Sequence, residues 1–360
     1  MNLDDLIEKK SEWLRGKGPR SDIVMSTRVR IARNLSGHLF FSWANDKQRS
    51  AALDEMVSAL TKNDFCKNAA CIRLKDTTEV DREFLVERHL MSVEHTQDPE
   101  YKGLIVGDGE IVSAMLNEED HMRLQVIQSG FSITEAWRMI DNIDTSLGKM
   151  LNYAYSNKFG YLTACPTNTG TGLRASVMLH LPALEITAQI ENVYEAISKL
   201  GLTIRGFYGE GTDASGNFFQ ISNQVALGHS EGDILDNLEK VINRVISREE
   251  ETRKYLMDNK KEETQDDIFR SLGTLKSARI ITSRETIKLL SAVRLGVDLG
   301  LIQDIDMVAL NEILLFMQPA HLQKINARTL TPHERDIKRA DMIREKLQSG
   351  DELKKKNKDG

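Results

Sequence analysis

Alternating polar and apolar positions predict a series of β-strands in the first two thirds of the chain. In the segment 23–33, Arg28 and Arg30 flank Val29. In a strand this spacing places both arginines on one face and the aliphatic residues on the other. Two arginines on one strand face repel each other unless an anion lies between them, although a basic solvated strand face would show the same pattern. Further strands are predicted at residues 111–116, 122–126, 175–181, 202–208 and 217–222.

Helix-period patterns lie between these strands and then take over the rest of the chain. An amphipathic helix is expected at residues 2–15, ended by the glycines that follow. Other helices are predicted at 47–63, 78–92, 132–158, 187–200 and from residue 230 onward. Near 255–265 the apolar stripe gives way to charge runs, and beyond it every predicted element is helical, at 283–299, 304–317 and 331–347. A domain boundary is therefore expected there.

Composition narrows the class of protein. The 360 residues suggest two domains or one large domain with an appendage, with 40% hydrophobic and 28% charged residues. A net charge of −6 gives no general attraction to nucleic acid or anionic membranes. No apolar run reaches the roughly 18 residues of a membrane span. The acidic N-terminus lacks a signal-peptide core, and the three cysteines form no disulfide or zinc pattern. We therefore expect a cytoplasmic protein.

The segment 165–177 carries the densest candidate chemistry. Gly170 and Gly172 would let the backbone approach a ligand and turn its N–H groups toward an anion, and Arg174 adds a planar cation suited to phosphate. A surface turn between two strands is the alternative. The same residues fit the dinucleotide fingerprint G-x-G-x-x-A, but that motif needs a helix after it. A strand pattern follows instead, which argues against a dinucleotide site.

An acidic segment, 117–121, follows one predicted strand and precedes another. Glu118, Glu119 and Asp120 are costly to hold together without a cation, which could be a metal, a guanidinium or Arg123. A solvated acidic hairpin tip is the alternative. A further carboxylate, Glu210, stands in a glycine-rich loop after the strand at 202–208.

Phosphoryl transfer to a basic nitrogen would require these groups to converge. Several arginines beside strands could clamp a polyphosphate, and carboxylates could align a guanidinium and accept its proton. A thiolate at Cys165 would suit a cationic substrate better than a covalent role, since no activating dyad is identifiable for it. The candidate arginines are Arg28, Arg30, Arg123, Arg174 and Arg205.

The last predicted helix opens with a capping box, in which Thr331 is followed three residues later by Glu334. Arg335 and Arg339 then lie on one helix face with Asp336 beside them. Spacing alone leaves a salt-bridged helix surface as the alternative.

Three motifs together resemble the ATP:guanido (phosphagen) kinases. They are the segments 26–30, 117–123 and 165–175, and the similarity covers roughly residues 21–250. The resemblance implies an α+β fold, with an antiparallel β-sheet flanked by helices, followed here by an all-helical C-terminal domain. It implies ATP and Mg²⁺, with no metal-ligating residues assigned in the chain. It also implies that Glu119 acts as base, that Glu210 is a second guanidinium-holding glutamate, and that Cys165 is the family's reactive cysteine.

The resemblance implies a nucleotide site formed by many residues. Its residues are Ser26, Thr27, Arg28, Val29, Arg30, His89, Arg123, Arg174, Ala175, Ser176, Val177, Met178, Arg205, Gly206, Phe207, Tyr208, Gly209 and Glu210.

Two departures from the free-guanidine kinases point to the substrate. Only 27 residues precede Arg28, whereas those enzymes carry a helical domain there, which suggests an open site that could admit a side chain still attached to a protein. The segment 335–340 resembles the R-D-x-x-R-A motif of bacterial protein-arginine kinases. That resemblance implies a phosphoarginine pocket with allosteric and assembly roles, formed by Arg335, Asp336, Ile337, Lys338, Arg339 and Ala340.

The expected function is therefore protein-arginine phosphorylation. The resemblance implies protein substrates with exposed or unfolded arginines, a Clp-type unfoldase, a heat-shock repressor, an activator protein, and a homodimer or larger assembly. The expected domains are 1–20 (N-terminal helix and linker), 21–255 (catalytic), 256–350 (helical) and 351–360 (charged tail). Two alternatives stay open: a kinase of a free guanidino metabolite, and a non-catalytic scaffold that binds phosphoarginine.

Overall fold

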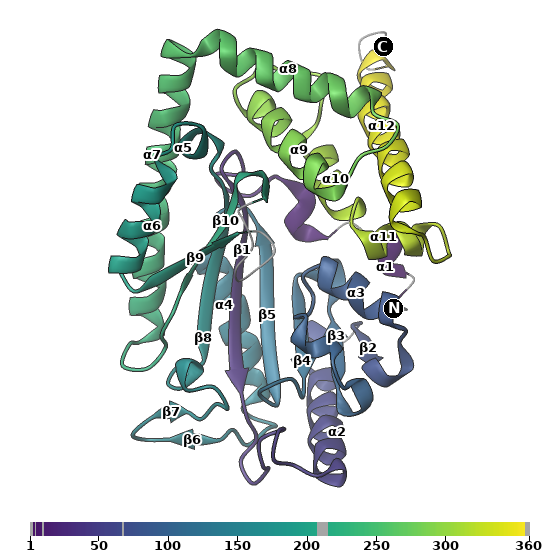
Figure 1. Cartoon of the computed structure of the whole chain (residues 1–360). Helices are drawn as coiled ribbons and strands as arrows, with labels where there is room; N and C mark the ends of the chain where they lie inside the picture. Colours follow the sequence, from purple (N-terminus) through teal and green to yellow (C-terminus); the bar gives the residue numbers. More distant parts are fainter. Residues whose placement is uncertain (1–2, 4, 9–10, 67, 207–214, 357–360) are drawn as a thin grey trace.

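The computed structural model describes residues 3, 5–8, 11–66, 68–206 and 215–356 (Figure 1). Its centre is an antiparallel eight-stranded sheet with the strand order β2-β3-β4-β5-β1-β8-β10-β9. The strands are β1 (Val24–Arg33), β2 (Ala70–Arg73), β3 (Gly103–Val106), β4 (Val112–Leu116), β5 (Met122–Ser129), β8 (Leu173–His180), β9 (Leu202–Gly206) and β10 (Phe218–Asn223). The expected antiparallel α+β fold is confirmed, with β1 near the middle of the sheet.

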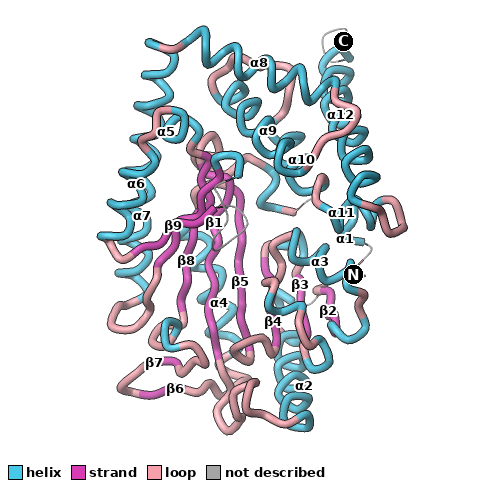
Figure 2. The backbone as a smooth tube through the Cα atoms, viewed as in Figure 1, coloured by secondary structure: helices cyan, strands magenta, loops and turns pink. Residues whose placement is uncertain are grey.

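Helices cover one face of this sheet (Figures 1 and 2). They are α2 (Asp46–Lys62), α4 (Ile133–Leu147), α6 (Ile190–Lys199) and α7 (Glu231–Asn259). The inward-facing aliphatic residues of the strands, such as Val29 and Val177, share one core with Ile140 of α4 and Leu238 of α7. Because successive side chains of a strand point to opposite faces, the polar residues of β1 and β8 lie on the other face of the sheet. The short helices α1 (Asp5–Glu8), α3 (Glu79–Glu87) and α5 (Pro182–Ile186) complete this part.

The remaining helices lie over one end of the opposite face (Figure 1). They are α8 (Lys261–Ser277), α9 (Ser283–Asp298), α10 (Met307–Phe316), α11 (Pro319–Ile325) and α12 (Pro332–Lys356). Their core also contains Trp13 from the N-terminal segment and the sheet residues Met25, Met178 and Phe218. The helical region thus packs directly on the eight-stranded sheet. None of the described helices combines the length and apolar character that a membrane crossing requires.

Several predicted helices have different bounds in the structure. The helix expected at 132–158 ends at Leu147. Residues beyond it form a small hairpin of β6 (Tyr155–Ser156) and β7 (Gly160–Tyr161), which packs on the core because the guanidinium carbon of Arg33 lies 3.5 Å from the Tyr161 ring centroid. The helix expected at 187–200 is α6, which begins at Ile190 because Ala188, at φ 55°, separates it from the preceding α5. Strands β2 and β3 were not predicted from the sequence pattern.

Two further predictions also change. The helix expected at 2–15 is the short α1 and a 3-10 turn at Glu12–Arg15. By contrast, α7 runs through the charge run where its apolar stripe fades. It continues because Glu249 and Arg253 are buried and paired at 2.8 Å, and Glu249 also accepts hydrogen bonds from the Ala183 and Leu184 N–H groups of α5.

A buried ionic network joins the N-terminal segment, α3 and the C-terminal helices. Arg88 is completely buried and pairs with Glu110, which also accepts a hydrogen bond of 2.5 Å from Ser11 Oγ. Arg88 Nη1 lies 3.3 Å from Nε2 of His321 on α11, whose Nδ1 lies 2.8 Å from Glu87. Because Arg88 and Glu110 have no access to water, each depends on the other for its charge.

We expect Arg88→Met to lower the free energy of unfolding by about 3–5 kcal/mol, because it leaves the Glu110 carboxylate buried without its cation. Arg15→Met is the matched control, since Arg15 pairs with Glu12 at the surface at 2.7 Å and such pairs contribute about 0–1 kcal/mol. Urea denaturation of both variants measures the difference. Equal losses would contradict the assignment of the network as a structural anchor.

Candidate active site

Four strands place five arginines on the face of the sheet opposite its helical cover. The strand register sets Arg30 beside Arg174, Ala32 beside Arg123, and Gln220 beside Arg205. Together with Arg28, these arginines line one cavity of about 800 Å³. The structure therefore brings together all five of the arginines that were expected to converge.

Most of the residues predicted to bind the nucleotide line this cavity, and the others are either buried in the sheet or lie outside the described residues. Its lining includes Ser26, Arg28, Arg30, His89, Arg123, Arg174, Ser176, Met178, Arg205 and Gly206. Thr27, Val29, Ala175 and Val177 alternate with these residues, and their side chains are buried away from the cavity. Phe207, Tyr208, Gly209 and Glu210 lie outside the described residues. Leu314 and Leu315 of α10 also line the cavity, a contribution that the sequence reading did not include.

Burial and neighbouring arginines disfavour the positive charge on Arg28 and Arg30 in this cavity. Burial, reinforced by the neighbouring Arg174 and Arg123, lowers the pKa of Arg28 to about 10. Burial, followed by the charges of Arg28, Arg123 and Arg174, also lowers the pKa of Arg30 well below its ordinary value. Arg28 Nη2 donates to Gln220 at 2.6 Å, whereas the buried Nε of Arg30 has no hydrogen-bond partner among the described residues. A polyphosphate would supply the missing negative charge.

His89 lies at the cavity wall just beyond α3, with φ at 60°. Its ring packs edge-on against Trp13, with 5.2 Å between ring centroids. Burial, with a smaller effect from Arg28, lowers the pKa of His89 to about 3, so the imidazole is neutral at physiological pH. It therefore adds polar surface to the cavity without adding charge.

Two of the three consecutive carboxylates share one partner, and the third bonds elsewhere. Arg123 Nη1 lies 2.7 Å from Glu118, and Arg123 Nη2 lies 3.5 Å from Glu119. Asp120 is buried and accepts hydrogen bonds of 2.7 Å from Asn34 Nδ2 and from the Ala164 N–H. Among the cations left open by the sequence, Arg123 is the one that the structure places beside Glu118 and Glu119. Partial burial, followed by the charge of Asp120, raises the pKa of Glu119 and strengthens it as a proton acceptor.

A second, smaller cavity of about 130 Å³ adjoins the first. Cys165 and Glu119 both line it, and Cys165 Sγ lies 3.0 Å from Thr167 Oγ1. The residues Arg30, Glu119, Arg123 and Arg174 line both cavities. We call the smaller cavity the slot. A group bound in the slot would thus meet a group bound in the larger cavity at a junction of three arginines and one carboxylate.

The glycines of the 165–177 segment have a structural role in packing the loop. A Cβ on Gly170, at φ 112°, would lie 2.8 Å from the Ala226 carbonyl oxygen, and one on Gly172, at φ 68°, would lie 2.6 Å from that of Ala32. Both positions therefore require glycine because protein backbone passes close by. The glycines thus let the loop pack against neighbouring backbone, and Gly172 also lines the smaller cavity.

The segment 335–340 lies on α12, away from these two cavities. Arg339 is buried, donates to the carbonyl oxygens of Met317 and Ile281 at 2.9 Å each, and pairs with Asp336. Arg335 Nη1 donates to the Leu330 carbonyl at 3.1 Å. Through these hydrogen bonds, Arg339 connects α12 to the segment before α9 and to the segment after α10.

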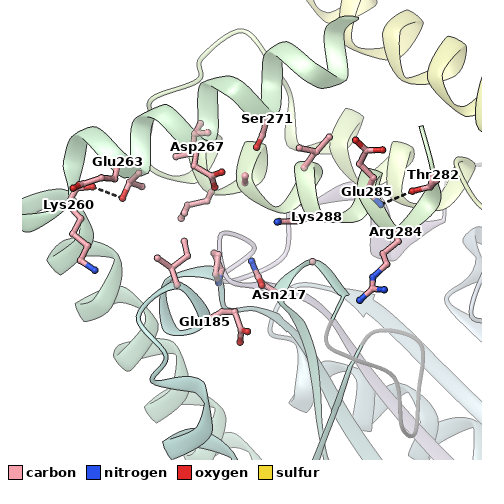
Figure 3. Close-up of a pocket in the computed structure, with 18 residues that line it drawn as sticks. Glu185, Asn217, Lys260, Glu263, Asp267, Ser271, Thr282, Arg284, Glu285 and Lys288 are labelled. Carbon is pink, nitrogen blue, oxygen red and sulfur yellow. Dashed lines mark hydrogen bonds between the residues drawn. The ribbon is translucent and has the colours of Figure 1, made fainter. Parts of the chain in front are cut away.

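Another cavity lies elsewhere, between α5, α8 and α9 (Figure 3). Its volume is about 1030 Å³, and its charged lining mixes both signs, with Lys288 and Arg284 facing Glu185 and Asp267 across it. It contains none of the predicted site residues. Among the described residues, no group of three or more His, Cys, Asp and Glu side chains could hold a metal ion.

Comparison with known proteins agrees with this geometry. The ATP:guanido phosphotransferase, C-terminal catalytic domain, matches residues 52–252, and the protein-arginine kinase McsB C-terminal domain matches residues 261–358. A solved taurocyamine kinase from Schistosoma mansoni, with bound transition state analog components, has a TM-score of 0.60 and 26% identity. The alignment covers 69% of this chain and 35% of that duplicated protein. A solved lombricine kinase, at 24% identity and a TM-score of 0.57, shares the fold over 69% of this chain and 76% of its own.

The fold and the two joined cavities define a phosphotransferase of the ATP:guanido class, and the chain belongs to the ATP:guanido phosphotransferase family. Within that family it is similar over nearly its whole length to protein-arginine kinases. That of Halothermothrix orenii is 46% identical over 96% of this chain and 99% of its own length. That of Bacillus subtilis is 43% identical over 96% of each chain.

Two arginines of β1 offer a paired test of the charge arrangement. We expect Arg30→Met to stabilise the ligand-free protein by about 1 kcal/mol, because it removes a buried and repelled charge, while abolishing ATP binding. Arg33→Met should instead destabilise by about 3–5 kcal/mol, because Arg33 is buried and pairs with Asp144 at 2.6 Å. Thermal unfolding with and without ATP measures both. A destabilised Arg30→Met variant would contradict the proposed repulsion.

Proposed function

We propose that this protein is a protein-arginine kinase that transfers the γ-phosphoryl group of ATP to arginine side chains of proteins. The observation that carries the proposal is the junction of the two cavities. The larger one offers five arginines and a volume of about 800 Å³ to the nucleotide, and the slot offers Cys165 and Glu119 to a guanidinium. The full-length similarity to protein-arginine kinases supports a protein-bound arginine as the acceptor.

The residues at the junction divide the chemistry between them. Arg30, Arg123 and Arg174 neutralise the charge that spreads over the transferred phosphoryl oxygens. Glu119 orients the guanidinium and accepts its proton as the P–N bond forms, which frees a nitrogen lone pair for attack. Cys165 lines the slot beside Glu119 and would contact the cationic acceptor there. The bond to the ADP leaving group breaks as the new P–N bond forms, so the products are ADP and phosphoarginine.

Mg²⁺ would enter as part of the nucleotide substrate. The carboxylates nearest the junction are partly paired with Arg123, so phosphate oxygens would be the principal ligands of Mg²⁺.

We place the reaction in the cytoplasm, where ATP is available. We also propose that phosphoarginine marks proteins for a Clp-type unfoldase and inactivates a heat-shock repressor, that an activator protein takes part, and that the chain assembles as a homodimer or larger oligomer. The family resemblance is the support for these partners.

We expect Glu119→Ala to lose phosphorylation of an unfolded protein by about 10²-fold or more while keeping its affinity for ATP. The products are measured as acid-labile phosphoramidate, with free arginine as a competing acceptor. Phosphorylation of free arginine alone would favour the metabolite kinase. Turnover that is unchanged in Glu119→Ala would remove Glu119 as the base, and a wild-type protein without any turnover would favour the phosphoarginine-binding scaffold.

The R-D-x-x-R-A segment is proposed as a phosphoarginine site with a role in assembly. Because Arg339 is buried and bonded to two carbonyl oxygens, Arg339→Ala should lower stability as well as phosphoarginine binding. Arg335→Ala is the cleaner probe, since its guanidinium is less buried and donates to one carbonyl among the hydrogen bonds described. We expect Arg335→Ala to weaken phosphoarginine binding at least tenfold in calorimetry with unchanged ATP affinity. Unchanged phosphoarginine affinity in this variant would place that site elsewhere.

A further inference from the structure

A small buried network connects the two walls of the slot. Asn34 follows the last residue of β1 and is almost completely buried. Its Oδ1 accepts a hydrogen bond of 2.9 Å from the His121 N–H, and its Nδ2 donates to Asp120 at 2.7 Å and to the Leu162 carbonyl at 3.0 Å. One amide side chain thus holds the carboxylate turn and the segment that leads to Cys165.

Asp120 extends this connection to the residue before the cysteine. The same Oδ1 that accepts from Asn34 also accepts the Ala164 N–H at 2.7 Å. Asp120 is adjacent in sequence to Glu119, and Ala164 is adjacent to Cys165. Asp120, next to the proposed base, is therefore hydrogen-bonded through one carboxylate oxygen to Ala164, next to the cysteine. Its other oxygen, Oδ2, is buried without a hydrogen-bond partner among the described residues.

We propose that Asn34 and Asp120 form a strut that fixes the spacing between Glu119 and Cys165, so that Asn34 is a positioning residue for the guanidinium of the acceptor. The proposal rests on the proposed function, because it assigns the slot to the acceptor. Asn34 is not among the lining residues of either cavity, so its effect on the substrate is indirect. A guanidinium is rigid and planar, and its two flanking groups must stay at a fixed distance for in-line transfer.

The geometry explains why these two residue types occur together. The amide of Asn34 accepts a hydrogen bond from the His121 N–H and donates two, to Asp120 and to the Leu162 carbonyl. An aspartate at position 34 would have no hydrogen to donate to these two oxygen acceptors. Because all of these groups are buried, an unmade bond is costly and the arrangement has one well-defined state. Other backbone bonds hold the outer side of the same region, including Ala154 N–H to the Asn34 carbonyl at 2.7 Å.

The test compares three variants of the full chain. Asn34→Ala removes the strut, and Asp120→Asn keeps its oxygen acceptor because the new NH₂ group can occupy the side that has no hydrogen-bond partner. Asn311→Ala is the matched control, since Asn311 is an equally buried amide with two hydrogen bonds, to Arg294 and to the Leu14 carbonyl, outside the slot. Asn34→Ser serves as a milder change if Asn34→Ala does not fold.

For Asn34→Ala we expect kcat/KM for the arginine acceptor to fall by roughly 10- to 100-fold, with the Kd of ATP within about twofold of the wild type. Asn34→Ser should show a smaller loss of the same kind. Asp120→Asn should keep the KM for the acceptor, while kcat falls because the charge that helps to raise the pKa of Glu119 is removed. Asn311→Ala should lower stability without changing the ratio of the two substrate affinities. Equal weakening of ATP and acceptor binding by Asn34→Ala, or a loss of stability alone, would overturn the strut.

Alkylation of Cys165 tests the same idea without any turnover. In a Cys71→Ser background, which removes the exposed cysteine and leaves Cys66 buried, Asn34→Ala should change the alkylation rate of Cys165 by at least threefold. Asn311→Ala should leave that rate unchanged. An identical rate in Asn34→Ala would overturn the strut, whereas a wild-type protein that phosphorylates no arginine would instead overturn the proposed function.

Discussion

Repulsion between arginines on one face of a rigid sheet is the constraint on which this site depends. The central strand β1 carries Arg28 and Arg30, and antiparallel pairing on both sides brings Arg174 and Arg123 beside them. The helices of the other face hold the strands in place, so the arginines cannot move apart without unpacking a core. The charge is therefore pre-organised for an anion before any ligand arrives, and stability is traded for function.

The carboxylates meet a different requirement on the same sheet. Arg123 is shared between Glu118 and Glu119, which joins the arginine cluster to the proposed base. Asp120 faces the protein interior, and its hydrogen bonds to Asn34 and Ala164 make it part of the frame. Three adjacent acidic residues thus have three roles, because a tight turn directs successive side chains to different sides.

The C-terminal helices belong to the site more closely than a separate domain would. Their core includes Met25 and Met178 from the sheet, and α10 supplies Leu314 and Leu315 to the wall of the nucleotide cavity. Arg88, Glu110 and His321 bind the same helices to the segment that carries His89. Changes in the packing of α10 or α11 would therefore reach the nucleotide cavity directly.

The sequence by itself determined the strand faces, the arginine cluster and the antiparallel α+β class. Alternation at Arg28 and Arg30 is a local property, and the three motifs are long enough to indicate the family. The tertiary structure decided what spacing leaves open. It placed Arg123 beside Glu118 and Glu119 as their cation. It showed that Gly170 and Gly172 lie close to neighbouring backbone. It also kept α7 helical through its charge run, because Glu249 and Arg253 are buried as a pair.

Asn34 carried no signal in the sequence, because its partners lie 86 residues or more away along the chain and meet it only when β1 and β5 pair. Contacts between distant segments decide such roles, and one-dimensional patterns do not contain them.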